Sequence, residues 1–124
     1  MKNKRPVNLN LLTVRFPIVA IASILHRISG LFLFFCIPFL LWMLTASLAS
    51  VDRFEQLRAF LTSLPVKIFI WLMLSALIYH LLAGIKHLLL DVHIGETLSV
   101  AKITSRCVLG LAILCSILLG VWLW

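Results

Sequence analysis

A histidine deep inside an apolar stretch is the first residue of this sequence whose type and place could support chemistry. His80 follows a long run of apolar residues, and polar side chains at such a depth in a membrane segment are costly and usually functional. Four residues recur with it at helical spacing and share its face, namely Ala76, Ala83, Gly84 and His87. Small residues around an imidazole leave a flat recess that suits a porphyrin with an axial iron ligand. A hydrogen bond to a neighbouring helix, or a proton relay, explains the same pattern.

A haem b with two axial ligands needs a partner for His80, and the sequence offers none at its depth. His26 lies at the cytoplasmic end of the first apolar stretch, level with His87 and roughly 10 Å along the helix axis from His80. His93 falls in a connection. If His80 binds haem, we therefore expect the opposite ligand to come from another polypeptide. Lys86 and His87 form a basic pair that would meet the haem propionates or simply be solvated.

Ser23 and Arg27 form the second candidate constellation. They are four residues apart, so one face of a helix presents both. Arginine stays charged, and a guanidinium near a hydroxyl at the membrane surface would hold a carbonyl oxygen that gains negative charge. A quinone has such an oxygen and a tail that dissolves in lipid. The alternative is an arginine that extends toward the membrane surface beside a serine that packs between helices.

The elements that must position these residues are membrane helices. Of the 124 residues 63% are hydrophobic and 12% are charged, which excludes an ordinary soluble enzyme and a disordered tail. Residues 28–51, 68–85 and 107–124 contain no Asp, Glu, Lys or Arg, and each is long enough to cross a bilayer.

We expect a single all-α membrane domain over residues 1–124. The predicted transmembrane spans cover about residues 28–49, 66–90 and 106–124, and an amphipathic interfacial stretch at about 17–27 precedes the first. Pro65 is expected to open the second helix. Ala112, Ser116 and Gly120 recur every four residues in the last span and would allow close approach to another helix, of this chain or of another.

The formal charge of +7 is explained by membrane topology rather than by nucleic-acid binding. Eight basic residues flank the spans on one side and three on the other. We therefore place the N-terminus in the cytoplasm or mitochondrial matrix. The C-terminus then lies in the periplasm or intermembrane space.

Two segments resemble the cytochrome b subunit of succinate dehydrogenase, the membrane anchor of complex II. The first comprises Arg5-Pro6-Val7-Asn8-Leu9, Arg15-Phe16-Pro17 and Ser23-Ile24-Leu25-His26-Arg27-Ile28-Ser29-Gly30. The second runs from His80 through Gly84 and His87 to Asp91, and follows the pattern H-x(3)-G-[IV]-[RK]-H-x(3)-D. The similarity covers nearly the whole chain, although the last helix matches only in hydrophobic character.

The resemblance implies a place in a multi-subunit enzyme of an inner membrane, bacterial or mitochondrial. A second three-helix anchor would pack against this chain and supply the other ligand of haem b. A flavoprotein subunit would oxidise succinate, and an iron–sulfur subunit would pass electrons to ubiquinone. The chain alone would have no dehydrogenase activity. His80 would be the axial haem ligand, Ser23 and Arg27 would line the quinone site, and His26, Arg27 and His87 would lie near the haem propionates.

Three other functions compete with this interpretation. The anchor of a fumarate reductase would run the same chemistry from quinol to fumarate. A purely structural anchor would hold a soluble enzyme on the membrane without haem or quinone. A transporter component is disfavoured, because the sequence has neither an inverted repeat nor a broken pair of helices at the midplane.

Overall fold

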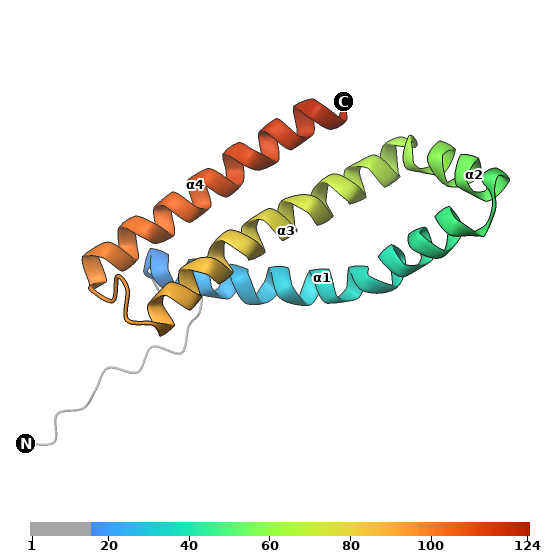
Figure 1. Cartoon of the computed structure of the whole chain (residues 1–124). Coiled ribbons are helices and arrows are strands. Elements are labelled where there is room, and N and C mark those ends of the chain that lie inside the picture. The colour runs from blue at the N-terminus through green and yellow to red at the C-terminus, as the bar shows by residue number, and fades with distance from the viewer. Residues whose placement is uncertain (1–15) are drawn as a thin grey trace, which may run out of the picture.

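The chain folds into three long apolar helices and one short polar helix over residues 16–124, the part that the structure, a computed structural model, describes. These are α1 (Ile18–Ala49), α2 (Val51–Leu61), α3 (Leu64–Asp91) and α4 (Leu98–Leu123), as Figure 1 shows. The three long helices are each long and apolar enough to cross a membrane. The predicted all-α architecture with three potential spans is therefore confirmed.

Helix α1 is longer than the first predicted span. Pro17 caps its N-terminus, and the helix continues for 32 residues, so the predicted interfacial stretch and the span form one element. The charge of Arg27 places the start of the predicted span directly after it, but Arg27 does not interrupt the helix, since arginine is a good helix former. The helix contains Pro38, and Figure 1 shows that its second half curves toward α2.

Helix α2 occupies the connection in which no helix was expected. The Ser50 hydroxyl accepts a hydrogen bond from the Arg53 backbone N–H at 3.1 Å, which caps the first turn. Asp52 lies in the first turn and Arg58 in the last, so both charges complement the helix dipole.

Helix α3 begins as predicted, with Pro65 in its first turn. Helix α4 begins at Leu98, well before the expected start at residue 106. The connection between them turns through His93 and Gly95, which have backbone φ values of 62° and 79°. Lys102, which precedes the predicted third span, therefore lies inside α4.

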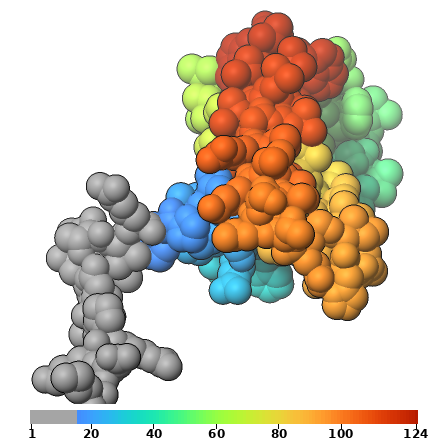
Figure 2. All heavy atoms as spheres, turned by 90° about the vertical axis from the view of Figure 1, so that its left-hand side faces the viewer, coloured from blue at the N-terminus to red at the C-terminus, as the bar shows by residue number. Residues whose placement is uncertain are grey.

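The elements that hold the candidate residues gather at one end of the bundle. Figures 1 and 2 show the start of α1 (blue) and the connection between α3 and α4 (orange) at this end. Helix α2 and the C-terminus lie at the other end. This arrangement agrees with three crossings that bring the start of α1 and the second connection to the same side.

Helix α3 packs against both α1 and α4. The Trp71 indole N–H donates to the Ser116 carbonyl at 2.8 Å, and a Cβ on Gly120 would lie 3.2 Å from that indole nitrogen. Ala112 is also buried. The stripe of small residues on α4 therefore allows close approach to a helix of its own chain.

Large apolar side chains cover the outside of the bundle. Among them, Phe35 is 70% exposed, Leu48 78% and Trp122 80%. A soluble protein rarely exposes so much apolar surface, whereas lipid or other membrane helices would cover it in a bilayer.

Candidate functional site

Helices α1 and α3 approach closely where their small residues face each other. Ala22 and Ala83 are each 2% exposed, and Ser29 is 8% exposed. The Tyr79 hydroxyl donates to the Ala22 backbone carbonyl at 2.6 Å and ties the two helices together. This close approach brings the histidines of both helices into one cluster.

His80 is held through one of its two ring nitrogen atoms. Its Nδ1 lies 3.0 Å from the Ser29 hydroxyl oxygen and 3.2 Å from the His26 backbone carbonyl oxygen. Gly30 lies against the same ring, because a Cβ on Gly30 would come within 2.9 Å of the His80 Cε1 atom. Contacts from about one turn of α1, at His26, Ser29 and Gly30, therefore fix the position of this imidazole.

The ring of His80 also lines an open apolar groove of about 430 Å³ between α1 and α3. Gly30, Phe34 and Ile37 line it from α1, and Met73 and Leu77 from α3. None of the described residues hydrogen-bonds to the His80 Nε2 atom. A neutral imidazole with one nitrogen held and the other free, beside an apolar groove, fits the requirements of an axial haem ligand.

His26 lies between His80 and His87. Its ring stacks on that of His80 with centroids 4.3 Å apart and planes 14° apart, and its centroid lies 5.0 Å from that of His87. The predicted difference in depth between His26 and His80 is therefore wrong, because the side chain of His26 reaches across to α3. Stacked rings nevertheless cannot serve as opposite ligands of one iron, which would have to lie between two opposed nitrogen atoms.

The recess predicted beside Gly84 is filled by the His26 ring. A Cβ on Gly84 would lie 3.5 Å from the His26 Nε2 atom. This nitrogen is buried, and it has no hydrogen-bond partner among the described residues. The open space beside His80 is provided instead by Gly30 on α1, so the glycine that matters for access to His80 is on the other helix.

Lys86 does not join His87 in a basic pair. Its side chain is 6% exposed, and its ammonium donates to the Ser105 hydroxyl on α4 at 2.6 Å. Consecutive residues of a helix point in directions about 100° apart, so His87 faces α1 while Lys86 faces α4. The expected solvation of Lys86 is therefore wrong, whereas its contact with haem propionates stays a prediction.

Ser23 and Arg27 lie one turn apart on α1, at the end of the bundle that carries the histidines. Ser23 is half-buried and Arg27 is exposed. Ser23 directly follows Ala22, whose carbonyl is bound by Tyr79, so this part of α1 is anchored to α3. The exposed guanidinium is therefore presented from a fixed piece of helix.

Sequence reasoning did not single out Ser29, Gly30 and Tyr79 as functional residues. The hydrogen bonds of Ser29 and Tyr79 and the contact of Gly30 all cross from one helix to the other. The available signal was the spacing of Ser29 and Gly30, three and four residues after His26, which places all three along one side of α1.

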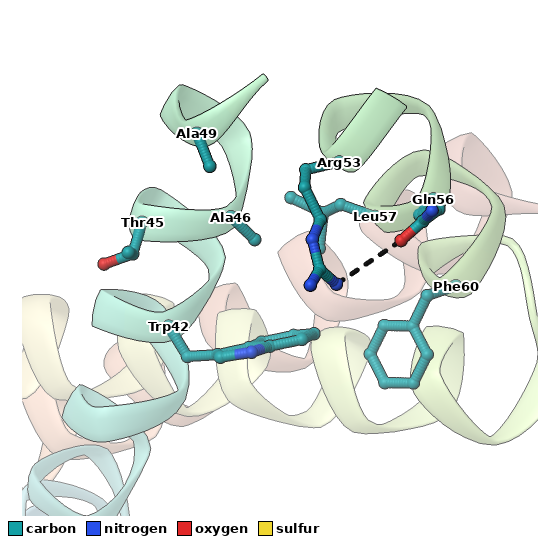
Figure 3. A pocket seen from close by; sticks show the side chains of 8 residues that line it. All are labelled: Trp42, Thr45, Ala46, Ala49, Arg53, Gln56, Leu57 and Phe60. Carbon is teal, nitrogen blue, oxygen red and sulfur yellow. Dashed lines mark hydrogen bonds between the residues drawn. The ribbon is translucent and has the colours of Figure 1, made fainter. Parts of the chain in front are cut away.

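A separate cleft of about 510 Å³ lies at the opposite end, between α1 and α2. Figure 3 shows the Arg53 side chain in this cleft, near Trp42 and Phe60. Arg53 donates to the Gln56 side-chain oxygen at 3.4 Å. None of the predicted site residues lines this cleft, so it is distinct from the histidine cluster.

The comparisons with known proteins agree with the transmembrane character of the three long helices. Residues 1–119 match the family described as succinate dehydrogenase/fumarate reductase transmembrane subunit. The chain belongs to this family. Among its relatives, the succinate dehydrogenase cytochrome b556 subunit of Coxiella burnetii is 41% identical, over the full length of both chains.

More distant members of the family also match along most of their length. The succinate dehydrogenase cytochrome b556 subunit of Rickettsia felis is 35% identical, over 98% of this chain and 92% of its own. That of Paracoccus denitrificans is 31% identical, over 94% of this chain and 90% of its own. The resemblance noted in two sequence motifs thus extends to a full-length family relationship.

Proposed function

We propose that this chain is the membrane-anchoring cytochrome b subunit of a succinate:ubiquinone oxidoreductase. It would hold haem b together with a second anchor subunit and help to form the site at which ubiquinone is reduced. A flavoprotein and an iron–sulfur subunit would supply the electrons from succinate. The chain itself would bind and orient the cofactor and the quinone, without dehydrogenase activity of its own.

The observation that carries this proposal is the environment of His80. Its Nδ1 is held by α1, while its Nε2 lies beside an apolar groove and has no hydrogen-bond partner in residues 16–124. This geometry supports haem ligation more than it supports a purely structural histidine, which would use the second nitrogen in another hydrogen bond. The full-length relatives are named as cytochrome b556 subunits, which supports the same cofactor.

His80 would hold haem b as an axial ligand, and His26, Arg27 and His87 would lie near its propionates. The buried, unpartnered Nε2 of His26 supports this assignment, since a carboxylate would satisfy it. Bound haem supplies a one-electron carrier within the membrane. The stacked rings of His26 and His80 favour a second ligand from the partner anchor.

Ser23 and Arg27 would bind the quinone head group. The Ser23 hydroxyl would donate to a quinone carbonyl, and the Arg27 guanidinium would stabilise negative charge on the oxygen as it is reduced. Protons would arrive from the side of the membrane at which α1 begins. We place this side in the cytoplasm or matrix, in a bacterial or mitochondrial inner membrane.

The reverse reaction, from quinol to fumarate, is the alternative function, and the family description covers both enzymes. The named relatives are all succinate dehydrogenase subunits, which favours succinate oxidation. Ubiquinone rather than menaquinone in the purified complex would agree with this direction.

The test is to purify the assembled complex through a tag on this chain and record its reduced-minus-oxidised spectrum. We expect flavoprotein, iron–sulfur and second anchor subunits to co-purify with a haem b band. His80→Ala should abolish or shift that band, while His93→Ala, which changes an exposed histidine of the α3–α4 connection, should leave it unchanged. A colourless assembled complex, or an unchanged spectrum in His80→Ala, would refute the proposal.

A further inference from the structure

We infer that Ser29, the His26 backbone carbonyl and Gly30 fix His80 in its Nδ1–H tautomer and aim its Nε2 at the iron. These groups are positioning elements, because they act through His80 and not on the iron. The inference rests on the proposed function, since it concerns the same imidazole, but it assigns roles to residues outside the predicted site.

Counting protons at the Nδ1 atom decides the tautomer. The Ser29 hydroxyl has one proton, which it donates to the His26 carbonyl at 2.8 Å. The same carbonyl lies 3.2 Å from His80 Nδ1, and a carbonyl oxygen only accepts hydrogen bonds. The bond from Nδ1 to this oxygen therefore requires a proton on Nδ1. That proton also points toward the Ser29 oxygen at 3.0 Å.

The neutral ring then has its lone pair on Nε2. A neutral imidazole carries a proton on only one nitrogen, so the tautomer held by α1 leaves Nε2 free for a metal. Ligating histidines commonly donate their other N–H to a carbonyl or similar acceptor, which fixes the ring and makes it a stronger ligand. Two acceptors on Nδ1–H, one of them backbone, provide this here.

Gly30 provides the space that this orientation needs. A side chain at this position would place its Cβ 2.9 Å from the His80 Cε1 atom and 3.8 Å from Nε2. Cε1 is bonded to both ring nitrogen atoms. A methyl group pressing on Cε1 would therefore rotate or displace the ring and move Nε2 from its position. Gly30 also lines the groove beside His80, so any side chain would narrow the access to Nε2.

Ser29→Ala in the purified complex tests the hydroxyl. Losing one acceptor from Nδ1–H makes the imidazole a weaker electron donor, so we expect the haem midpoint potential to rise while His80 remains a ligand. Ser29→Thr retains the hydroxyl and should restore the potential of the unmodified complex. Ser47→Ala is the matched control, because Ser47 makes the same type of bond to a carbonyl three residues earlier in α1, at 2.7 Å, away from the histidines.

Gly30→Ala tests the close contact. We expect roughly a 10- to 100-fold loss of haem affinity, the range typical for disturbed outer-shell partners of a metal ligand, together with altered electron paramagnetic resonance of the oxidised haem. Gly110→Ala is the control, since a Cβ there would have no neighbour within 4 Å. If Gly30→Ala does not assemble, the Ser29 series alone decides.

These outcomes separate this inference from the proposed function. If His80→Ala keeps the haem spectrum, the proposed function fails and this inference fails with it. If His80→Ala loses the spectrum while Ser29→Ala matches Ser47→Ala in potential, His80 is the ligand but Ser29 does not position it. A rise in potential with Ser29→Ala that Ser29→Thr reverses supports the inference.

Discussion

The residues of the candidate site come from two helices and divide into two kinds of environment. His26 and His80 are packed between α1 and α3 with their rings stacked, whereas Arg27 is exposed one residue after His26. Neighbouring residues of one turn of α1 therefore face the interior of the helix pair and its surface. Such an arrangement would bring a quinone bound at the surface close to a redox centre beside His80.

Ser23→Ala and Arg27→Ala test the surface part of this site. Because a donor aimed at developing negative charge is worth about 100-fold or more in rate, we expect Arg27→Ala to lower quinone reduction by about that factor. The effect of Ser23→Ala should be smaller, since a neutral donor contributes less than a charged one. Succinate oxidation with a soluble artificial electron acceptor should be unchanged in both variants.

The control for these variants is Arg58→Ala on α2, an exposed arginine whose guanidinium lies 3.8 Å from Glu55 at the opposite end of the molecule. Its loss should affect neither activity. Equal loss of quinone reduction and succinate oxidation in Arg27→Ala would indicate failed assembly, and unchanged quinone reduction would remove Arg27 from the site.

At the scale of the helices, apolar composition predicted the spans but not the ends of the helices. Arg27 and Lys102 mark where the chain becomes charged, and the helices continue through both because neither side chain disfavours a helix. Helix α2 was not predicted, although Ser50 and Asp52 are typical of a helix start. Its sequence is too polar for a membrane span, and apolar composition was the signal used to predict helices.

The sequence also could not reveal which neighbour each face of α3 meets. Helical spacing correctly grouped His80 with Gly84, but the space beside Gly84 is taken by His26 of α1. The direction of Lys86 depends on the packing of α4, which brings Ser105 to its ammonium. Periodicity gives the face of one helix, whereas contacts require the relative placement of two.

The bond between Lys86 and Ser105 gives a stability prediction for the α3–α4 pair. Ser105 is 0% exposed, and its hydroxyl also donates to the Ala101 carbonyl at 2.7 Å. Ser105→Ala would leave a buried ammonium without this acceptor, which we expect to cost about 1–2 kcal/mol, the scale of a hydrogen bond between membrane helices. Lys86→Met removes the charge together with its need for an acceptor and should cost less.

Thermal unfolding of the detergent-solubilised complex measures which of these two variants loses more stability. Thr104→Ala is the control, because the partners of the Thr104 hydroxyl within the described part of the chain are carbonyls of its own helix, Val100 and Ala101. We expect Ser105→Ala to lower the melting temperature more than Lys86→Met and Thr104→Ala. A larger loss in Lys86→Met would mean that the charge itself stabilises the helix pair.

At the scale of the whole molecule, few side chains of residues 16–124 are buried, and many large apolar ones are exposed. The buried apolar residues are mostly small, such as Ala22, Ala83 and Ala112, so the helices pack by close approach of their backbones rather than around a large core. Such packing is typical of membrane helices. It leaves the wide outer faces of α1 and α4 for lipid or for other subunits.

The two ends of the molecule differ in charge, and this difference predicts its orientation. Among the described residues, the end where α1 begins and α3 meets α4 carries Arg27, Lys102 and Arg106, while α2 at the other end has Asp52 and Glu55 beside its arginines. Basic residues are retained on the cytoplasmic side. A reporter fused after Trp124 should therefore read as periplasmic in bacteria, and one fused after truncation at Glu96 as cytoplasmic.

If both reporters lie on the same side of the membrane, α4 does not cross the bilayer once between them. If the two locations are exchanged, the chain has the opposite orientation to the one predicted. In that case Ser23 and Arg27 would face the periplasm, away from the side on which we place electron delivery to quinone.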